Sequence, residues 1–147
     1  AGELEQGLKK IQPLLRHVTI LNLNDEEASL LTHLPIARRN ETIQILLGTG
    51  VQHVLLTHGS EGATYADGNK QFFAPGLKVR VANRTGAGDA FGSGFVAGFI
   101  KTRNADNALR VAMLNSSSVI QKIGAKNGLL EKFPAYAALD KIKIRRE

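Results

Sequence analysis

The stretch Asn83-Arg84-Thr85-Gly86-Ala87-Gly88-Asp89-Ala90-Phe91 carries the most structural information in this chain. It combines a glycine-rich turn with one carboxylate at the predicted start of a helix. Backbone N–H groups at a helix N-terminus attract anions, and glycines let a phosphate approach the main chain without meeting a Cβ atom. The turn is therefore typical of a phosphate site, where Asp89 is suited to accept a proton from an attacking hydroxyl.

Length and composition limit the class of protein. The chain has 147 residues, of which 43% are hydrophobic, and it has no cysteine. We expect one domain over residues 1–147, because the chain is too short for two ordinary domains. The lack of cysteine excludes disulfides and thiolate metal sites. With no apolar run as long as a membrane span and no signal-peptide pattern at the start, we expect a cytoplasmic protein that binds no membrane.

The positive charge of the chain does not indicate a nucleic-acid partner. The formal net charge is +6, but the basic residues are scattered along the sequence. The densest group, Lys141 to Arg146, lies at the C-terminus, where a solvated tail is the simpler interpretation. We therefore expect no nucleic-acid binding.

In the first part of the chain, helical and strand patterns alternate. Leu4, Leu8, Ile11 and Leu15 have helical spacing, although Pro13 interrupts it. The pattern then predicts a strand at residues 18–23, a helix opened by Asp25-Glu26-Glu27, a helix at residues 36–47 stopped by Gly48 and Gly50, and a strand at residues 51–57. This alternation predicts an α/β layered fold.

The second part of the chain begins with short strands. Residues 63–66 and 71–74 flank an Asp-Gly turn and predict an inserted β-hairpin, and residues 79–82 predict a further strand. Two long helices follow. The first has a stripe of Phe91, Phe95 and Phe99, with Gly88, Gly92, Gly94 and Gly98 leaving room for close packing, and the second has Leu109, Ala112, Ser116, Val119 and Ile123 on one face.

Four motifs in the same order resemble those of the ribokinase-like (PfkB-type) carbohydrate kinases. Thr85 to Phe91 is similar to the signature of this family, Asn24-Asp25-Glu26-Glu27 to its Asn-x-x-Glu motif, Thr57 to Gly62 to its nucleotide-contacting turn, and Gly124-Ala125 to its late loop. One glycine motif is weak evidence, but four in order are much stronger. The resemblance implies the C-terminal half of a ribokinase-like three-layer αβα sandwich, which transfers the γ-phosphate of ATP to a sugar or nucleoside hydroxyl.

The resemblance implies that Asp89 is the catalytic base. The N–H groups of Gly86, Ala87 and Gly88 would stabilise negative charge on the transferring phosphoryl group. Asp is also favoured at helix starts, so a capping carboxylate is the competing explanation. We prefer the base, since a cap does not require small residues before it.

Asn24 and Glu27 have two compatible interpretations. In the family, this pair organises Mg²⁺ and phosphate, mostly through water, and oxygen ligands suit Mg²⁺. The same spacing also predicts an Asn N-cap with Glu at the capping-box position.

Further binding residues follow from the same resemblance. The expected nucleotide contacts are Asn24, Thr57, Gly59, Ser60, Gly62, Gly88 and Met113, where Met113 replaces a polar residue that family members often place beside adenine. The expected monovalent-cation residues are Asn83, Thr85 and Gly124. Many members have Asp at the position of Asn83, so a requirement for K⁺ is left open. His17, His33, His53 and His58 are interpreted as structural or exposed, because His58 has no acidic partner at a useful sequence spacing.

The resemblance covers the nucleotide side of such a kinase and little of its sugar side. We therefore expect weak or no turnover by this polypeptide alone. Apolar surface would then be exposed, or covered by the N-terminal half or by a second copy in a homo-oligomer. Three functions stay open: a sugar kinase, a nucleoside or pyrimidine kinase of the same fold, and a nucleotide-binding module without catalysis.

Overall fold

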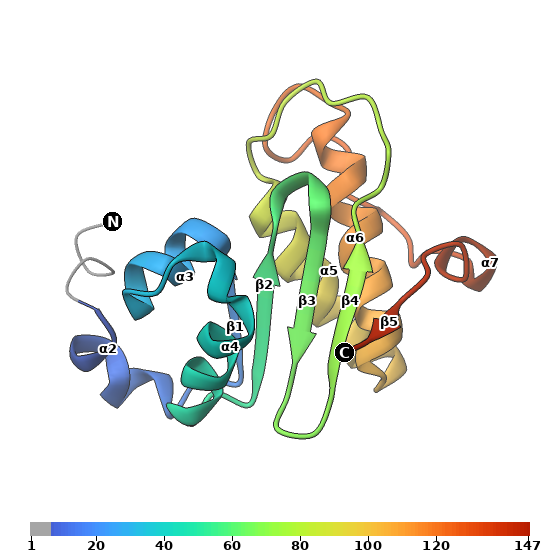
Figure 1. Cartoon of the computed structure of the whole chain (residues 1–147). Helices are drawn as coiled ribbons and strands as arrows, with labels where there is room; N and C mark the ends of the chain where they lie inside the picture. Colours follow the sequence, from blue (N-terminus) through green and yellow to red (C-terminus); the bar gives the residue numbers. More distant parts are fainter. Residues whose placement is uncertain (1–6) are drawn as a thin grey trace. The chain divides into compact units, whose positions relative to one another are not determined.

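The computed structural model describes residues 7–147 and shows an α/β chain (Figure 1). These residues form two compact units. The first runs to His58 and includes Thr64–Gln71, and the second comprises Gly59–Ala63 and Phe72–Glu147. Hydrogen bonding orders the strands β1-β2-β3-β4-β5, with a parallel β1–β2 pair and an antiparallel β4–β5 pair. The sheet is therefore mixed. Leu4 of the predicted first helix lies outside the described residues.

The described part of the first unit contains four helical segments and the parallel pair of strands β1 and β2. Its elements are α2 (Leu8–Leu15), β1 (Ile20–Asn24), α3 (Asp25–Thr32), the 3₁₀ helix η1 (Ile36–Arg38), α4 (Arg39–Gly48), β2 (His53–Thr57) and most of β3 (Gly62–Ala66). In the β1–β2 register, Asn24 lies opposite Thr57. Both strands thus end at the same edge, and the chain positions that follow them are neighbours.

The core of the first unit is aliphatic. It consists of Leu15, Leu23, Ala28, Leu31, Ile43, Leu46, Val51, Val54, Leu56 and Ala66. Apart from Val51, which precedes β2, its members come from α2, β1, α3, α4, β2 and β3, and burial of this apolar surface holds these elements together.

The turn after β3 is closed by a polar cluster around Asp67. Its Oδ1 accepts hydrogen bonds from the N–H groups of Asn69 and Lys70, and its Oδ2 accepts one from the Tyr65 hydroxyl at 2.7 Å. Burial, together with this hydrogen bond and the Asp67 charge, raises the pKa of Tyr65 far above its usual value. Burial alone would raise the pKa of Asp67, but the three hydrogen bonds lower it below its usual value. This Asp-Gly turn confirms the predicted hairpin.

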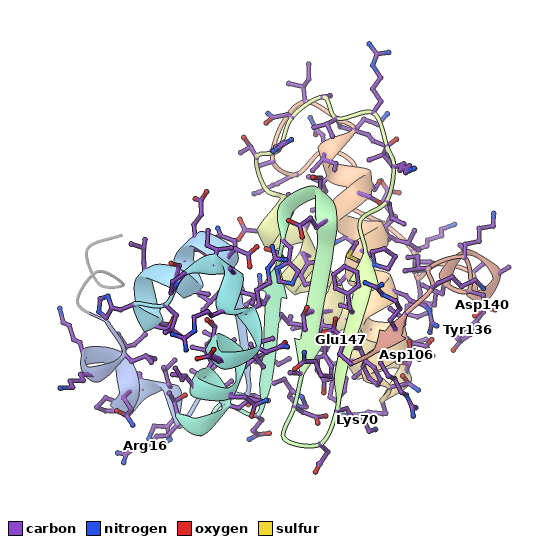
Figure 2. All side chains as sticks on the ribbon, in the orientation of Figure 1. Arg16, Lys70, Asp106, Tyr136, Asp140 and Glu147 are labelled. Carbon is purple, nitrogen blue, oxygen red and sulfur yellow. The ribbon has the colours of Figure 1, made fainter. Side chains whose placement is uncertain are left out.

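The second unit is built on two long helices. Its elements are η2 (Gly59–Glu61), β4 (Gln71–Pro75), α5 (Ala87–Thr102), α6 (Ala105–Ile120), the short α7 (Tyr136–Leu139) and β5 (Arg145–Arg146), although Gln71 belongs to the first unit. Tyr136 and Asp140, at the end of the chain, are exposed (Figure 2). Within residues 7–147, none of the helices is both long and apolar enough to cross a membrane.

Glycines allow α5 and α6 to pack closely side by side (Figure 1). A Cβ atom on Gly94 would come within 3.1 Å of the Ala112 Cα atom, and one on Gly98 within 2.8 Å of the Ala108 Cα atom. Phe91 and Phe95 are buried in the same helix, as the stripe predicted. A side chain at either glycine would therefore push the helix backbones apart.

The structure corrects three predicted elements. Residues 79–82 are not a strand, because the N–H groups of Ala82 and Asn83 donate to the Ile120 carbonyl rather than to a neighbouring strand. The helix predicted from residue 36 begins as η1, and α4 starts only at Arg39. Helix α6 ends at Ile120, so Ile123 lies beyond it and is 78% exposed.

The basic C-terminal stretch is also not simply a solvated tail. Arg145 and Arg146 form β5 and pair with Phe73 and Phe72 of β4. The guanidinium of Arg145 lies 4.7 Å from the Phe73 ring centroid. A guanidinium is attracted to the face of an aromatic ring. The charge pattern of the sequence alone could not reveal this contact.

The α5–α6 packing predicts a specific cost for an added methyl group. Gly98→Ala should lower the free energy of unfolding by about 1–3 kcal/mol, because the clash is with backbone. Gly48→Ala is the matched control, since a Cβ there meets nothing within 4 Å, and it should be neutral or stabilise by up to about 1 kcal/mol. Urea unfolding of both variants measures this difference, and equal midpoints would contradict the packing account.

Candidate functional site

The predicted phosphate turn leads directly into α5. Gly86 is the N-cap residue in the left-handed region, with φ of 83°, and Asp89 lies in the first helical turn. Asp89 is exposed. The N-cap residue is Gly86, so Asp89 is not itself the N-cap, but a carboxylate in the first turn also interacts favourably with the helix dipole. The N–H of Ala87 donates to the Arg84 carbonyl at 3.2 Å, so one of the three expected anion-binding groups closes the turn instead.

The left-handed turn at Gly86 is fixed by the late loop. A Cβ atom at Gly86 would lie 2.4 Å from the Ala125 carbonyl oxygen. Both the positive φ and this close approach therefore require glycine. The structure thus brings together two motifs that are far apart in the sequence, the glycine turn and Gly124-Ala125.

Polar side chains of α6 hold the first turn of α5. The buried Asn115 amide donates to the Ala90 carbonyl at 2.7 Å, and the Ser116 hydroxyl donates to the Ala87 carbonyl at 3.0 Å. The Asn115 carbonyl oxygen also accepts from the Leu130 N–H at 2.9 Å. These bonds fix the backbone on both sides of Asp89. Asn115 was not predicted as a site residue, although a polar residue at an inward position of α6 is a usable signal.

The predicted cation residues occupy the loop before α5. The Asn83 Oδ1 atom accepts from the Thr85 N–H at 2.9 Å, which uses this oxygen within the loop. Gly124 is in the left-handed region, with φ of 104°. A monovalent-cation role for these residues stays a prediction.

At the edge where β1 and β2 end, Asn24 and Glu27 form a complete capping box. The Asn24 Oδ1 atom accepts from the Glu27 N–H at 2.8 Å, and the Glu27 Oε2 atom accepts from the Asn24 N–H at 2.9 Å. The capping interpretation is therefore confirmed, and it is compatible with a second role because each oxygen has a further lone pair.

His58 is buried, and the fold gives it an acidic partner that is distant in the sequence. Its Nδ1 atom lies 2.8 Å from Asp25 Oδ1, and its Nε2 atom lies 2.9 Å from the Thr64 hydroxyl. Asp25 also accepts two hydrogen bonds from Arg39. The partners are 33 residues apart, so spacing along the sequence could not reveal them.

The remaining predicted nucleotide residues differ in their surroundings. Thr57 ends β2 and is half-buried, while Gly59 and Ser60 are exposed. The fold requires glycine at position 62 whether or not it contacts a nucleotide, because a Cβ there would lie 2.0 Å from the Ala74 carbonyl oxygen. Met113 is 8% exposed within α6, which agrees with apolar packing but does not test an adenine contact.

The donor set at the capping box fits Mg²⁺ only in a water-rich form. Within residues 7–147, no group of three His, Cys, Asp or Glu side chains could hold a metal by itself. Mg²⁺ commonly keeps several waters and uses one or two carboxylates together with substrate phosphates. The Asn24 and Glu27 oxygens suit that arrangement.

Comparison with known proteins identifies the family. The sequence profile of the pfkB family of carbohydrate kinases matches residues 3–132. The chain belongs to this family. An uncharacterised sugar kinase of Archaeoglobus fulgidus is 29% identical, over 85% of this chain and 49% of its own length. The ribokinase of Lactococcus lactis is 30% identical, over 71% and 35%. This pfkB-family chain therefore spans less than half the length of these relatives.

Solved structures confirm the ribokinase-like fold. A ribokinase of Arabidopsis thaliana, solved with ribose and ATP, is 27% identical with a TM-score of 0.75 and is matched over 42% of its chain and 88% of this one. A provisionally assigned ribokinase II of E. coli, solved with ATP and Mg²⁺, is 26% identical with the same TM-score, over 39% of its chain and 83% of this one. The predicted ribokinase-like α/β fold class is thus confirmed.

The glycine turn gives a stability prediction for two neighbouring positions. Gly86→Ala should lower the free energy of unfolding by about 1–3 kcal/mol, because alanine must adopt a strained φ and would meet the late loop. Gly88→Ala should change it by less than about 1 kcal/mol, since a Cβ there meets nothing within 4 Å. Thermal unfolding compares them, and an equal loss in both variants would show that the contact with Ala125 does not fix the turn.

Proposed function

We propose that the chain is the nucleotide-binding and catalytic part of an ATP-dependent phosphotransferase that moves the γ-phosphate to a sugar hydroxyl. The observation that carries this proposal is Asp89, an exposed carboxylate in the first turn of α5, three residues after the glycine N-cap Gly86. The family and the names of its sugar-kinase members support the reaction class.

In this proposal, Asp89 accepts the proton of the acceptor hydroxyl as that oxygen attacks the γ-phosphorus. The leaving group is ADP, and the proton stays on the Asp89 carboxylate until it is released to solvent. The N–H groups of Gly86, Ala87 and Gly88 stabilise the negative charge of the phosphoryl group. Ala87 can take part only if its bond to Arg84, which is long at 3.2 Å, gives way.

The proposed cofactors are ATP and Mg²⁺. Bound Mg²⁺ neutralises charge on the phosphates. On this chain, Glu27 and Asn24 would hold it through water, and Thr57, Gly59, Ser60, Gly62 and Met113 are the proposed nucleotide contacts. The E. coli structure with ATP and Mg²⁺ supports the choice of both. A K⁺ ion near Asn83, Thr85 and Gly124 is a further proposal.

Two alternatives stay open. A nucleoside acceptor is supported by the cytidine kinase of Thermococcus kodakarensis, which is 29% identical over 41% of its length and 78% of this chain. A nucleotide-binding module without catalysis is the second alternative, and it requires only that the chain bind ATP. Substrate panels separate a sugar from a nucleoside acceptor, and the Asp89 variant below separates catalysis from binding.

The role of Asp89 predicts a separation of binding from rate. Asp89→Asn should keep ATP affinity within a few-fold and lower phosphate transfer by at least about 100-fold, because an amide cannot accept the proton. Radiolabelled γ-phosphate transfer and calorimetric ATP titration measure the two effects. Asp106→Asn is the control carboxylate, since it lies on α6 away from the glycine turn. Measurable transfer by wild type that is equally fast in Asp89→Asn would reject the base.

We also propose that this polypeptide alone has weak or no turnover. Two facts support this. The chain spans less than half of its relatives, and α5 exposes Ile100, which lines a groove of about 630 Å³ together with Leu129, Leu130 and Phe133. Exposed apolar surface of this kind is typical of an interface.

Transfer from ATP to a panel of sugars and nucleosides tests this directly. We expect turnover at least about 100-fold below that of a typical kinase, which is 1–100 per second. Turnover in that range by the isolated chain would contradict the proposal.

A further inference from the structure

His58 is a buried histidine that the proposed reaction does not use. Its side chain is 1% exposed. Both ring nitrogens have partners in the first unit, Asp25 at 2.8 Å and Thr64 at 2.9 Å. A plain core position would favour an apolar residue, because a buried imidazole costs free energy unless both nitrogens are satisfied. The two hydrogen bonds to Asp25 and Thr64 therefore explain a histidine at this buried position.

Asp25 is the residue that His58 and Arg39 share. The Arg39 guanidinium donates to both Asp25 oxygens, at 3.1 Å from Nε and 2.6 Å from Nη2. The Asp25 side chain is 14% exposed. Its charge is thus neutralised by a bidentate partner, and three hydrogen bonds occupy most of its acceptor sites. Asp25 is consequently less available to bind a metal than a carboxylate without such partners.

The position of Asp25 links this network to the capping box. Asp25 is the first residue of α3, directly after Asn24 and two residues before Glu27. Its side chain is held by Arg39 of α4 and by His58, which directly follows β2, and His58 is in turn bonded to Thr64 of β3. A fixed Asp25 limits how the first turn of α3 can move, and with it the two oxygens of the box.

We propose that His58 and Arg39, acting through Asp25, are positioning residues that hold the Asn24–Glu27 box in the geometry used for Mg²⁺ and nucleotide phosphate. The inference rests on the proposed function for its second half, the link to Mg²⁺. Partners that orient metal ligands in this way commonly change metal affinity by large factors without touching the metal.

Two substitutions at His58 separate its two contacts. His58→Asn places an amide N–H near the Nδ1 position and can keep the bond to Asp25, whereas His58→Gln places its amide near the Nε2 position and keeps only the bond to Thr64. Thr64→Val is the matched control, because it removes the Nε2 partner and leaves Asp25 untouched. Arg39→Gln tests the other partner of Asp25 at a side chain that is 30% exposed, in case a change at the buried histidine prevents folding.

The first measurement is hydrogen exchange of the Glu27 backbone amide without any ligand. This amide donates to Asn24 Oδ1, so its protection reports on the box directly. His58→Gln and Arg39→Gln should speed its exchange by about tenfold or more relative to the Val119 amide of α6. His58→Asn and Thr64→Val should stay within about threefold.

The second measurement is calorimetric ATP affinity with Mg²⁺ and with EDTA. In His58→Gln and Arg39→Gln, the gain in affinity that Mg²⁺ provides should fall by about tenfold or more, while the affinity in EDTA is unchanged. In His58→Asn, which can keep the bond to Asp25, the gain in ATP affinity from Mg²⁺ should match that of the wild type.

The outcomes separate this inference from the proposed function. Unchanged Glu27 exchange in His58→Gln and Arg39→Gln would overturn the positioning role. Faster exchange with an unchanged Mg²⁺ effect would overturn its link to the site and leave a structural contact. If wild type binds no ATP in either condition, the proposed function fails and the Mg²⁺ half of the inference fails with it, while the exchange data still decide the positioning half.

Discussion

The close approach of α5 and α6 is the constraint on which the second unit depends. Because Gly94 and Gly98 have no side chains, the backbones come near enough for α6 to bond the first turn of α5. The Asn115 amide donates to the Ala90 carbonyl, and the Ser116 hydroxyl donates to the Ala87 carbonyl. The direction of the helix start, and with it the direction of Asp89, is thus set by packing some distance along the helix. A helix start held in this way keeps the Asp89 backbone in one place.

Local patterns were sufficient to predict most elements and the start of the site. Period and stop signals found α3, both long helices, the β-hairpin and the strands β1 and β2, since each depends on residues close in the sequence. The motif from Thr85 to Asp89 was placed at a helix start for the same reason. The capping box was also predictable, because Asn24 and Glu27 are only three residues apart.

The features that were missed depend on distant partners. The Asp25–His58 contact joins the ends of two strands, and its hydrogen bond requires the β1–β2 register that only the fold provides. Residues 79–82 have strand-like composition, but the N–H groups of Ala82 and Asn83 donate to the Ile120 carbonyl at the end of α6 instead of to a strand. Arg145 and Arg146 have the sequence pattern of a solvated tail, but they pair with Phe73 and Phe72 of β4 as strand β5, and their guanidinium groups lie over the two rings. In each case tertiary contacts overrode a local preference.

The central claim is that the turn from Gly86 to Gly88 binds the transferring phosphate beside Asp89. A crystal structure of the chain with Mg²⁺ and a non-hydrolysable ATP analogue tests it most directly. The account predicts the γ-phosphate within hydrogen-bond distance of N–H groups in this turn, about 2.7–3.2 Å, with the Asp89 carboxylate facing the side from which an acceptor would attack. A triphosphate bound elsewhere on the chain, with the turn unoccupied, would contradict it.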